Sequence, residues 1–195
     1  MEKQVFAMRV FQKKRVLLIL LLGLMTILFL KSDWLAEWMY PVHFKEDIRA
    51  SASNYGVESH LVAAIIRSES NFQTGRESKK GALGLMQIMP DTAAWVVQKA
   101  GFQEVTNDML MNRADVSIEV GAWYLRSLSQ QFGQNKIAAI AAYNAGPGNV
   151  RKWLDSGTWD GTIESVKEIP FGETRHYVQR VIYYYNKYKD LYPSL

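Results

Sequence analysis

The distribution of apolar and polar residues divides the chain into a short apolar run near the N-terminus and a longer body with helical periodicity. Residues 16–30 carry no charge, and from residue 44 onward apolar positions recur every three or four residues. That spacing is typical of amphipathic α-helices, and no sustained two-residue alternation indicates a strand. We therefore predict an all-α body over residues 44–193.

Helix start and stop signals place the elements of this body. The predicted helices span residues 44–54, closed by Gly56; 59–68, capped by Ser59; 90–100, between Pro90 and Gly101; 115–132, capped by Asp115; 135–144; and 173–191. Residues 71–84 have the composition of a loop, and residues 146–148 (Gly-Pro-Gly) interrupt the chain. The last helix is expected to present Tyr177, Val181, Tyr184 and Tyr188 on one side.

The apolar run near the N-terminus is typical of a membrane segment. Lys13, Lys14 and Arg15 precede fifteen uncharged residues, a length below the ~17–20 of a spanning helix, although flanking basic side chains can extend it. A cleaved signal peptide is the alternative, but the candidate cleavage sites Leu30-Lys31-Ser32 and Trp34-Leu35-Ala36 both lack a small residue at the first position. Because basic residues stay inside, we expect a single-pass protein of the cell membrane with an extracytoplasmic body. Its parts are a basic cytoplasmic segment (1–15), a transmembrane signal anchor (16–30), a juxtamembrane spacer (31–43) and the all-α domain (44–193).

Composition and charge exclude several classes of site. The 195 residues are 48% hydrophobic and 22% charged, as in an ordinary globular domain. There is no cysteine, which excludes disulfides, a thiol nucleophile and Cys-ligated metals, and the three histidines show no metal-binding spacing. We predict no metal and no cofactor. The net charge of +4 divides into +5 over residues 1–31 and −1 over the remainder, so the body lacks the basic face of a nucleic-acid-binding domain.

One carboxylate falls on the apolar face of a predicted helix. Leu61, Val62, Ile65 and Ile66 form that face, and Glu69 follows the last two by four and three residues. Partial desolvation raises the pKa of a carboxyl above its usual ~4.3, which suits a general acid near neutral pH. On geometry alone, a solvated glutamate in the last turn of an ordinary helix is the alternative.

Four segments around this carboxylate resemble a known family. They are residues 68–70 (Ser-Glu-Ser), 78–90 with the run Gly-Leu-Met-Gln-Ile-Met-Pro, 142–150 with Ala-Tyr-Asn-Ala-Gly, and 169–178 with Glu-Thr and Tyr-Val. Their order and spacing resemble the catalytic domain of the soluble-type lytic transglycosylases, relatives of goose-type lysozyme, over about residues 44–190. The resemblance implies a lysozyme-like helical domain with a substrate groove.

The resemblance also implies the roles of individual residues. Glu69 matches the family's sole catalytic acid and base, and the matched substrate-binding residues are Ser78, Met86, Gln87, Met89, Tyr143, Asn144 and Tyr177. Each has a structural alternative: the polar residues also stabilise turns, and the methionines and tyrosines also pack in cores. For Met86 the two alternatives are equally open.

The implied activity is that of a membrane-anchored peptidoglycan lytic transglycosylase for local cell-wall remodelling. Such an enzyme cleaves the N-acetylmuramic acid–β-1,4–N-acetylglucosamine bond of glycan strands without water and leaves 1,6-anhydro ends. A hydrolytic muramidase is one alternative, and it needs a second carboxylate, for which Glu77 and Asp91 are nearest in sequence. A non-catalytic glycan-binding scaffold is the other.

One segment departs from the family pattern. In the helix predicted from Asp115, the family's Pro and Asn are missing and Ser117 stands at the expected Asn position. We expect this departure to concern helix capping more than chemistry. Residues 104–117 are expected to form a loop, and the sequence does not decide whether a protein partner contacts it.

Overall fold

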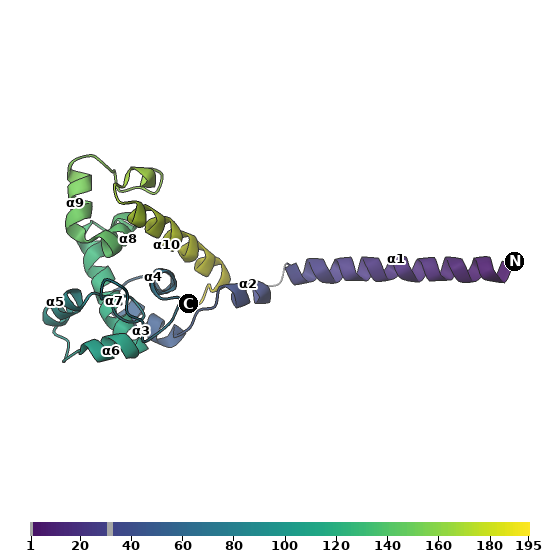
Figure 1. Cartoon of the computed structure of the whole chain (residues 1–195), viewed down its shortest axis with the longest axis horizontal. Coiled ribbons are helices and arrows are strands. Elements are labelled where there is room, and N and C mark those ends of the chain that lie inside the picture. The colour runs from purple at the N-terminus through teal and green to yellow at the C-terminus, as the bar shows by residue number, and fades with distance from the viewer. Residues whose placement is uncertain (1, 31–32) are drawn as a thin grey trace. The chain divides into compact units, whose positions relative to one another are not determined.

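The computed structural model of the chain describes the backbone of residues 2–30 and 33–195 and the side chains of residues 13–29 and 35–195 (Figure 1). The chain divides into two compact units, an N-terminal unit ending at Pro41 and a body, Val42–Leu195. Each unit is described by itself.

The N-terminal unit contains the helices α1 (Glu2–Leu30) and α2 (Asp33–Met39). The large apolar side chains of α1 from Val16 to Phe29 are exposed, with 67% of the Leu17 surface accessible. Within the described residues, no helix combines the length and the apolar character needed to cross a bilayer. The transmembrane helix expected over residues 16–30 is therefore not confirmed. The segment expected to be a spacer contains α2.

The body is built almost entirely from helices. In chain order they are α3 (Lys45–Tyr55), α4 (Ser59–Glu69), α5 (Pro90–Ala100), α6 (Asn107–Asn112), α7 (Ala114–Gln131), α8 (Lys136–Ala145), α9 (Pro147–Asp155), the 3₁₀ helix η1 (Val166–Glu168) and α10 (Gly172–Leu191). Two isolated antiparallel bridges, from Leu83 to Glu77 and to Ile88, occur in the loop between α4 and α5. The predicted all-α class is confirmed.

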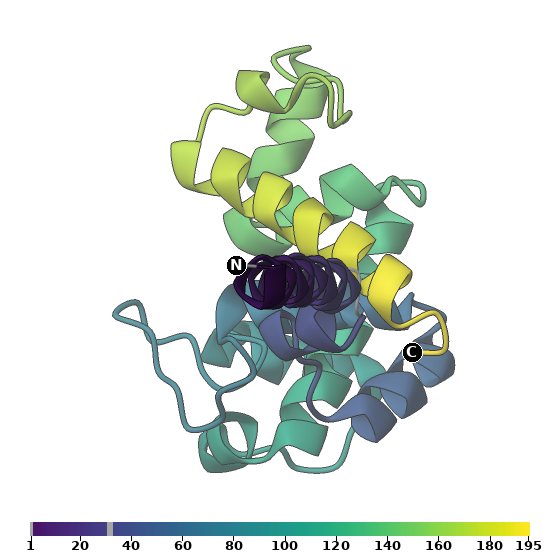
Figure 2. The same cartoon turned by 90° about the vertical axis from the view of Figure 1, so that its right-hand side faces the viewer.

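Helix α4 is the central element of the body. All six residues from 61 to 66 are buried, so the helix is covered on every side and not only along the predicted stripe. Helix α10 packs along α4 and runs across the body (Figure 2), and α3 also contacts α4. Helix α7 contacts α3, α5, α6 and α8. Residues 61–66 of α4 are therefore enclosed by other elements of the body, and its last residues, 67–69, are partly exposed.

Most predicted helix boundaries agree with the structure. Helices α3, α5, α8 and α10 begin and end within about one residue of the predicted limits. Gly56 and Gly101 end α3 and α5 in the left-handed conformation, with φ of 63° and 69°. Pro90 is the first residue of α5, and the Asn135 side chain caps α8 by accepting from the Ala138 amide. These confirmed ends all depend on contacts between neighbours in sequence.

Two α-helices of the body, α6 and α9, were missed. Pro147, which was expected only to interrupt the chain, begins α9, because proline is as favourable at a first helical position there as at Pro90. The loop expected over residues 104–117 contains α6, whose N-cap Thr106 accepts a hydrogen bond from the Met109 amide. Residues 104–117 are therefore mostly helical.

Two capping predictions were wrong. Asp115 does not cap α7: it lies in the first turn, 2.5 Å from the guanidinium of Arg113. Ser59 is the first residue of α4, which has Glu58 at the N-cap position. On α10, Tyr177, Val181 and Tyr188 are buried, Tyr184 is half-buried and stacks on Tyr188, and Tyr185 is also buried. The bounds of α4 and α7 thus agree with the prediction to within one residue, but their N-cap positions are occupied by Glu58 and Arg113.

Candidate active site

Glu69 is the last residue of α4 and lines a cavity of about 380 Å³ at the end of that helix. The next residue, Ser70, is fully buried, and its hydroxyl donates to the Leu85 carbonyl over 2.7 Å. This bond ties the end of α4 to the loop that forms one wall of the cavity. Ser70 therefore fixes the position of the loop, and Glu69 presents its carboxyl to the cavity.

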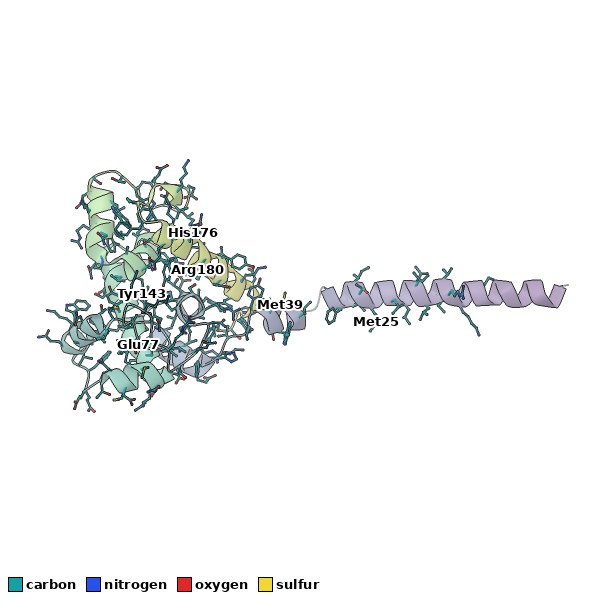
Figure 3. All side chains as sticks on the ribbon, in the orientation of Figure 1. Met25, Met39, Glu77, Tyr143, His176 and Arg180 are labelled. Carbon is teal, nitrogen blue, oxygen red and sulfur yellow. The ribbon has the colours of Figure 1, made fainter. Side chains whose placement is uncertain are left out.

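The environment of Glu69 favours its protonated form. Burial raises the pKa of the carboxyl to about 7, and the nearby negative charge of Glu173 acts in the same direction. The Tyr177 hydroxyl and the positive charge of Arg180, on α10 (Figure 3), partly offset this by lowering the pKa. Near neutral pH the Glu69 carboxyl is therefore present in both protonation states, as a general acid and base requires.

Two tyrosines flank the carboxyl. Tyr177, from α10, is 2% exposed, and its hydroxyl makes no hydrogen bond of ordinary geometry with a described residue, although it lies close enough to Glu69 to lower the pKa of that group. Tyr143, from α8, lines the cavity and donates to the Met86 carbonyl over 3.0 Å (Figure 3). Burial and then the Glu69 charge raise the pKa of both hydroxyls well above 10, so both remain neutral.

The loop between α4 and α5 supplies the polar residues Ser78 and Gln87 to the cavity. Ser78 Oγ accepts hydrogen bonds from the backbone amides of Lys80 and Ala82, at 3.2 and 2.9 Å. The Gln87 amide nitrogen donates to the carbonyls of Arg76 and Gly84, at 3.2 and 2.8 Å. Both residues thus stabilise the loop, and both also line the cavity.

The two methionines of this loop have different environments. Met89 is 42% exposed and lines the cavity. Met86 is fully buried beneath it, and its thioether lies against Gly121 of α7. Its backbone amide donates to the buried Ser117 Oγ over 3.1 Å. The Met86 side chain is therefore a core residue and does not line the cavity, and Ser117 anchors the loop instead of capping a helix.

Asn144 also lines the cavity, and its orientation is fixed by a residue that the sequence interpretation did not single out. The buried Thr174 hydroxyl donates to Asn144 Oδ1 over 2.7 Å. Because the amide oxygen is the acceptor, the amide nitrogen of Asn144 is the group that can donate to a ligand. Thr174 lies three residues before Tyr177 in the segment 169–178, and its place in that segment is the sequence feature from which its contact with the site could have been predicted.

The second carboxylate of the cavity is also a residue that was missed. Within the described part of the chain, Glu173 is the acid that lines this cavity together with Glu69. Glu77 is exposed in the loop (Figure 3), and Asp91 lines a separate cavity of about 350 Å³ beside Trp95. The structure therefore brings neither carboxylate suggested by the sequence into the Glu69 cavity.

Comparison with known proteins places this site in a family. The Transglycosylase SLT domain profile matches residues 46–166. The chain is 38% identical over 151 residues to the soluble lytic murein transglycosylase of Escherichia coli K12, covering 76% of this chain and 23% of that protein. It is 28% identical over 155 residues to the membrane-bound lytic murein transglycosylase C of Actinobacillus pleuropneumoniae, covering 69% and 42%.

Solved structures give the same result. An inactive mutant of lytic transglycosylase Slt from Pseudomonas aeruginosa superimposes with a TM-score of 0.73 at 38% identity, over 79% of this chain and 25% of that one. The 70-kDa soluble lytic transglycosylase bound to bulgecin A gives 0.74 at 35% identity, over 80% and 25%. The chain thus spans about a quarter of the length of the Escherichia coli relative and of these structures.

Proposed function

Because the chain belongs to the Transglycosylase SLT domain family, we propose that its body is a peptidoglycan lytic transglycosylase. The observation that carries the proposal is the Glu69 carboxyl, which burial holds at a pKa of about 7 in a cavity lined by amide, hydroxyl and aromatic groups. The substrate is the glycan strand, and the cleaved bond joins C1 of N-acetylmuramic acid to O4 of N-acetylglucosamine. Ser78, Gln87, Met89, Tyr143 and Asn144 contact the sugars.

The reaction uses one carboxyl twice. Protonated Glu69 donates its proton to the glycosidic oxygen as the C1–O bond breaks, and the 2-acetamido oxygen of the muramyl sugar stabilises C1. The Glu69 carboxylate then removes the proton of the C6 hydroxyl, whose oxygen forms a bond to C1 and displaces the acetamido oxygen. The products are a new N-acetylglucosamine 4-hydroxyl and a 1,6-anhydromuramyl end, and no water is consumed. Tyr177 is a positioning residue for the carboxyl.

A hydrolytic muramidase is the second candidate, and Glu173 is the observation that favours it. An inverting hydrolase places its two carboxyls about 6.5–9.5 Å apart, with the second activating water. Glu173 lines the same cavity, but it is exposed and ion-paired with Lys80. The lyase remains the first candidate, because it requires the Glu69 carboxyl alone.

The test is mass spectrometry of the fragments that the purified full chain releases from peptidoglycan. The proposal expects products lighter by one water than reducing-end species and unchanged by borohydride. Glu69→Gln should lower the rate at least a hundredfold, as expected for loss of a general acid, with helical circular dichroism unchanged. Borohydride-reducible products would instead establish the hydrolase, and binding without products would establish a glycan-binding module.

We also propose that the N-terminal unit holds the enzyme at the membrane, for local wall remodelling. The proposal is supported by the uncharged run of residues 16–30 behind three basic residues and by the exposed apolar side chains of α1. No described helix is both long and apolar enough to cross a membrane. The test is therefore fractionation: the full chain should stay with membranes after a high-salt wash. Release into the soluble fraction would exclude the anchor.

A further inference from the structure

Three polar side chains form a cluster at the N-terminal end of α4, opposite to the end that carries Glu69. Glu58 is the N-cap residue of α4, Lys136 is the first residue of α8, and Tyr185 lies on α10. Lys136 Nζ lies 2.5 Å from Glu58 Oε1 and donates to the Tyr185 hydroxyl over 2.8 Å, and that hydroxyl donates to Glu58 Oε2. The cluster therefore joins three helices at one point.

The contacts within this cluster are charge-assisted. Tyr185 is 7% exposed, and the Lys136 ammonium also lies 4.2 Å from the centre of its ring. Burial opposes the ionisation of Glu58 and Lys136, but the hydrogen bonds of the cluster outweigh burial, so that the pKa of Glu58 is lowered and the pKa of Lys136 is raised. Both groups therefore stay charged through neutral pH, and the Tyr185 hydroxyl bonds to opposite charges on its two sides.

Both helices that begin at the cluster end at the Glu69 cavity. Glu69 is the last residue of α4, Tyr143 and Asn144 lie in the last turn of α8, and all three line the cavity. At a rise of about 1.5 Å per residue, the cluster lies about 16 Å from Glu69 along α4 and about 10 Å from Tyr143 along α8. An axial shift of one helix against the other therefore moves the acid relative to the groups proposed to bind the sugars.

The packing of α8 leaves its axial position relative to α4 weakly determined. Each of the two helices packs on α10, but among the described residues the direct contacts between α4 and α8 are few. Alanine side chains form low ridges, which allow close packing but resist sliding less than large side chains do. Four of the five buried residues of α8 are alanines (Ala138, Ala139, Ala141, Ala142). The cluster therefore supplies a fixed point that this packing lacks.

Resting on the proposed function, we propose that the three residues of this cluster are positioning residues for bond cleavage. By holding the N-terminal ends of α4 and α8 together, the cluster sets the distance between the Glu69 carboxyl and the sugars bound by Tyr143 and Asn144. None of its three residues lines the Glu69 cavity, so the cluster acts through the two helices and does not contact the substrate. Its effect is large enough to measure, because a misplacement of about 1 Å costs about a hundredfold in rate.

The experiment compares two tyrosine-to-phenylalanine variants of the full chain in mild detergent. Tyr185→Phe removes the hydroxyl of the cluster. Tyr55→Phe is the matched control, because it removes a hydroxyl that also donates to a carboxylate, that of Glu119, over 3.0 Å between α3 and α7. For a displacement of a few tenths of an ångström, we expect kcat of Tyr185→Phe on peptidoglycan strands to fall roughly three- to tenfold, with KM unchanged. Tyr55→Phe should keep the wild-type values of both.

Two further measurements separate positioning from a loss of folded protein. Urea unfolding gives the folded fraction of each variant, and each rate is divided by that fraction. Lys136→Met removes the ammonium of the cluster, and because the cluster acts as one unit, its combination with Tyr185→Phe should lower kcat no further than the larger single loss. The proposal is overturned by an unchanged kcat in Tyr185→Phe, by an equal fall in Tyr55→Phe, by a rise in KM as large as the fall in kcat, or by a double loss equal to the product of the single losses.

A readout that needs no activity distinguishes the failure of this inference from the failure of the proposed function. The backbone amides of residues 69 and 143–145 lie about 10 Å or more from the cluster along their helices. Their nuclear magnetic resonance signals should therefore shift in Tyr185→Phe and stay in place in Tyr55→Phe. A wild-type chain that cleaves no peptidoglycan overturns the lyase, and these signals then test the inference alone. Signals that stay in place in Tyr185→Phe overturn it.

Discussion

Replacing the Glu69 carboxyl with an amide should make the native state more stable at alkaline pH. The fold raises the pKa of this carboxyl from 4.5 to about 7, so the folded state binds the proton more tightly than the unfolded state does. For a raised pKa, the stabilisation is complete below the unfolded value and is lost as pH rises through the folded value. One pKa unit corresponds to about 1.36 kcal/mol, so between pH 4 and pH 8 the wild type loses about 3 kcal/mol that Glu69→Gln retains.

Urea unfolding of the full chain at pH 4 and pH 8 measures this difference. Tryptophan fluorescence reports on the body, because Trp153 and Trp159 are 5% and 1% exposed. The free energy of unfolding of Glu69→Gln, relative to wild type, should increase by about 3 kcal/mol between the two pH values. Glu77→Gln, in the exposed part of the loop, should show no such increase. A relative stability of Glu69→Gln that does not change with pH would refute the buried, protonated carboxyl.

Two further predictions concern the tyrosine beside the carboxyl and the loop under the cavity. Tyr177→Phe removes a hydroxyl that lowers the pKa of Glu69. In a pH-rate profile, the alkaline limb of kcat/KM should therefore shift to higher pH by roughly half to one unit. A shift of this limb to lower pH would contradict the assignment. Gly84→Ala should lower the free energy of unfolding by about 3 kcal/mol or more, because its new Cβ would lie 2.0 Å from the Leu110 carbonyl oxygen. Gly101→Ala is the control in urea unfolding, because φ is similar at the two positions, +69° at Gly101 and +72° at Gly84, but nothing lies within 4 Å of a Cβ at Gly101. Gly101→Ala should therefore lower the free energy of unfolding by only about 1–2 kcal/mol. Equal losses for the two variants would exclude the clash.

The position of the acid could be predicted because it depends on local periodicity. A residue three and four positions after Ile66 and Ile65 must lie on their face of the helix, whatever packs against it. The structure confirms both the buried face and the effect of burial on the pKa of Glu69. The sequence motifs also predicted that the loop carrying Ser78 and Gln87 lies beside the acid, and in the structure both residues line the Glu69 cavity.

The contacts that shape the rest of the cavity could not be predicted, because they join distant parts of the chain. The Lys80–Glu173 pair spans 93 positions and the Thr174–Asn144 hydrogen bond spans 30. Both depend on how the first turn of α10 meets the loop and α8, which helical periodicity does not determine. The same applies to Met86, whose burial is decided by the space that Gly121 leaves on α7.

A single carboxyl that must first give and then take a proton places a strict demand on its surroundings. At pH 7 a carboxyl with the ordinary pKa of ~4.3 is protonated in only about one molecule in 500, whereas Glu69, at about 7, is protonated in about half. Burial at the end of a central helix accounts for this value, and the Tyr177 hydroxyl and Arg180 charge prevent it from rising further. The proposed mechanism therefore rests on a balance between burial, which favours the protonated acid, and the Tyr177 hydroxyl and Arg180 charge, which favour the carboxylate.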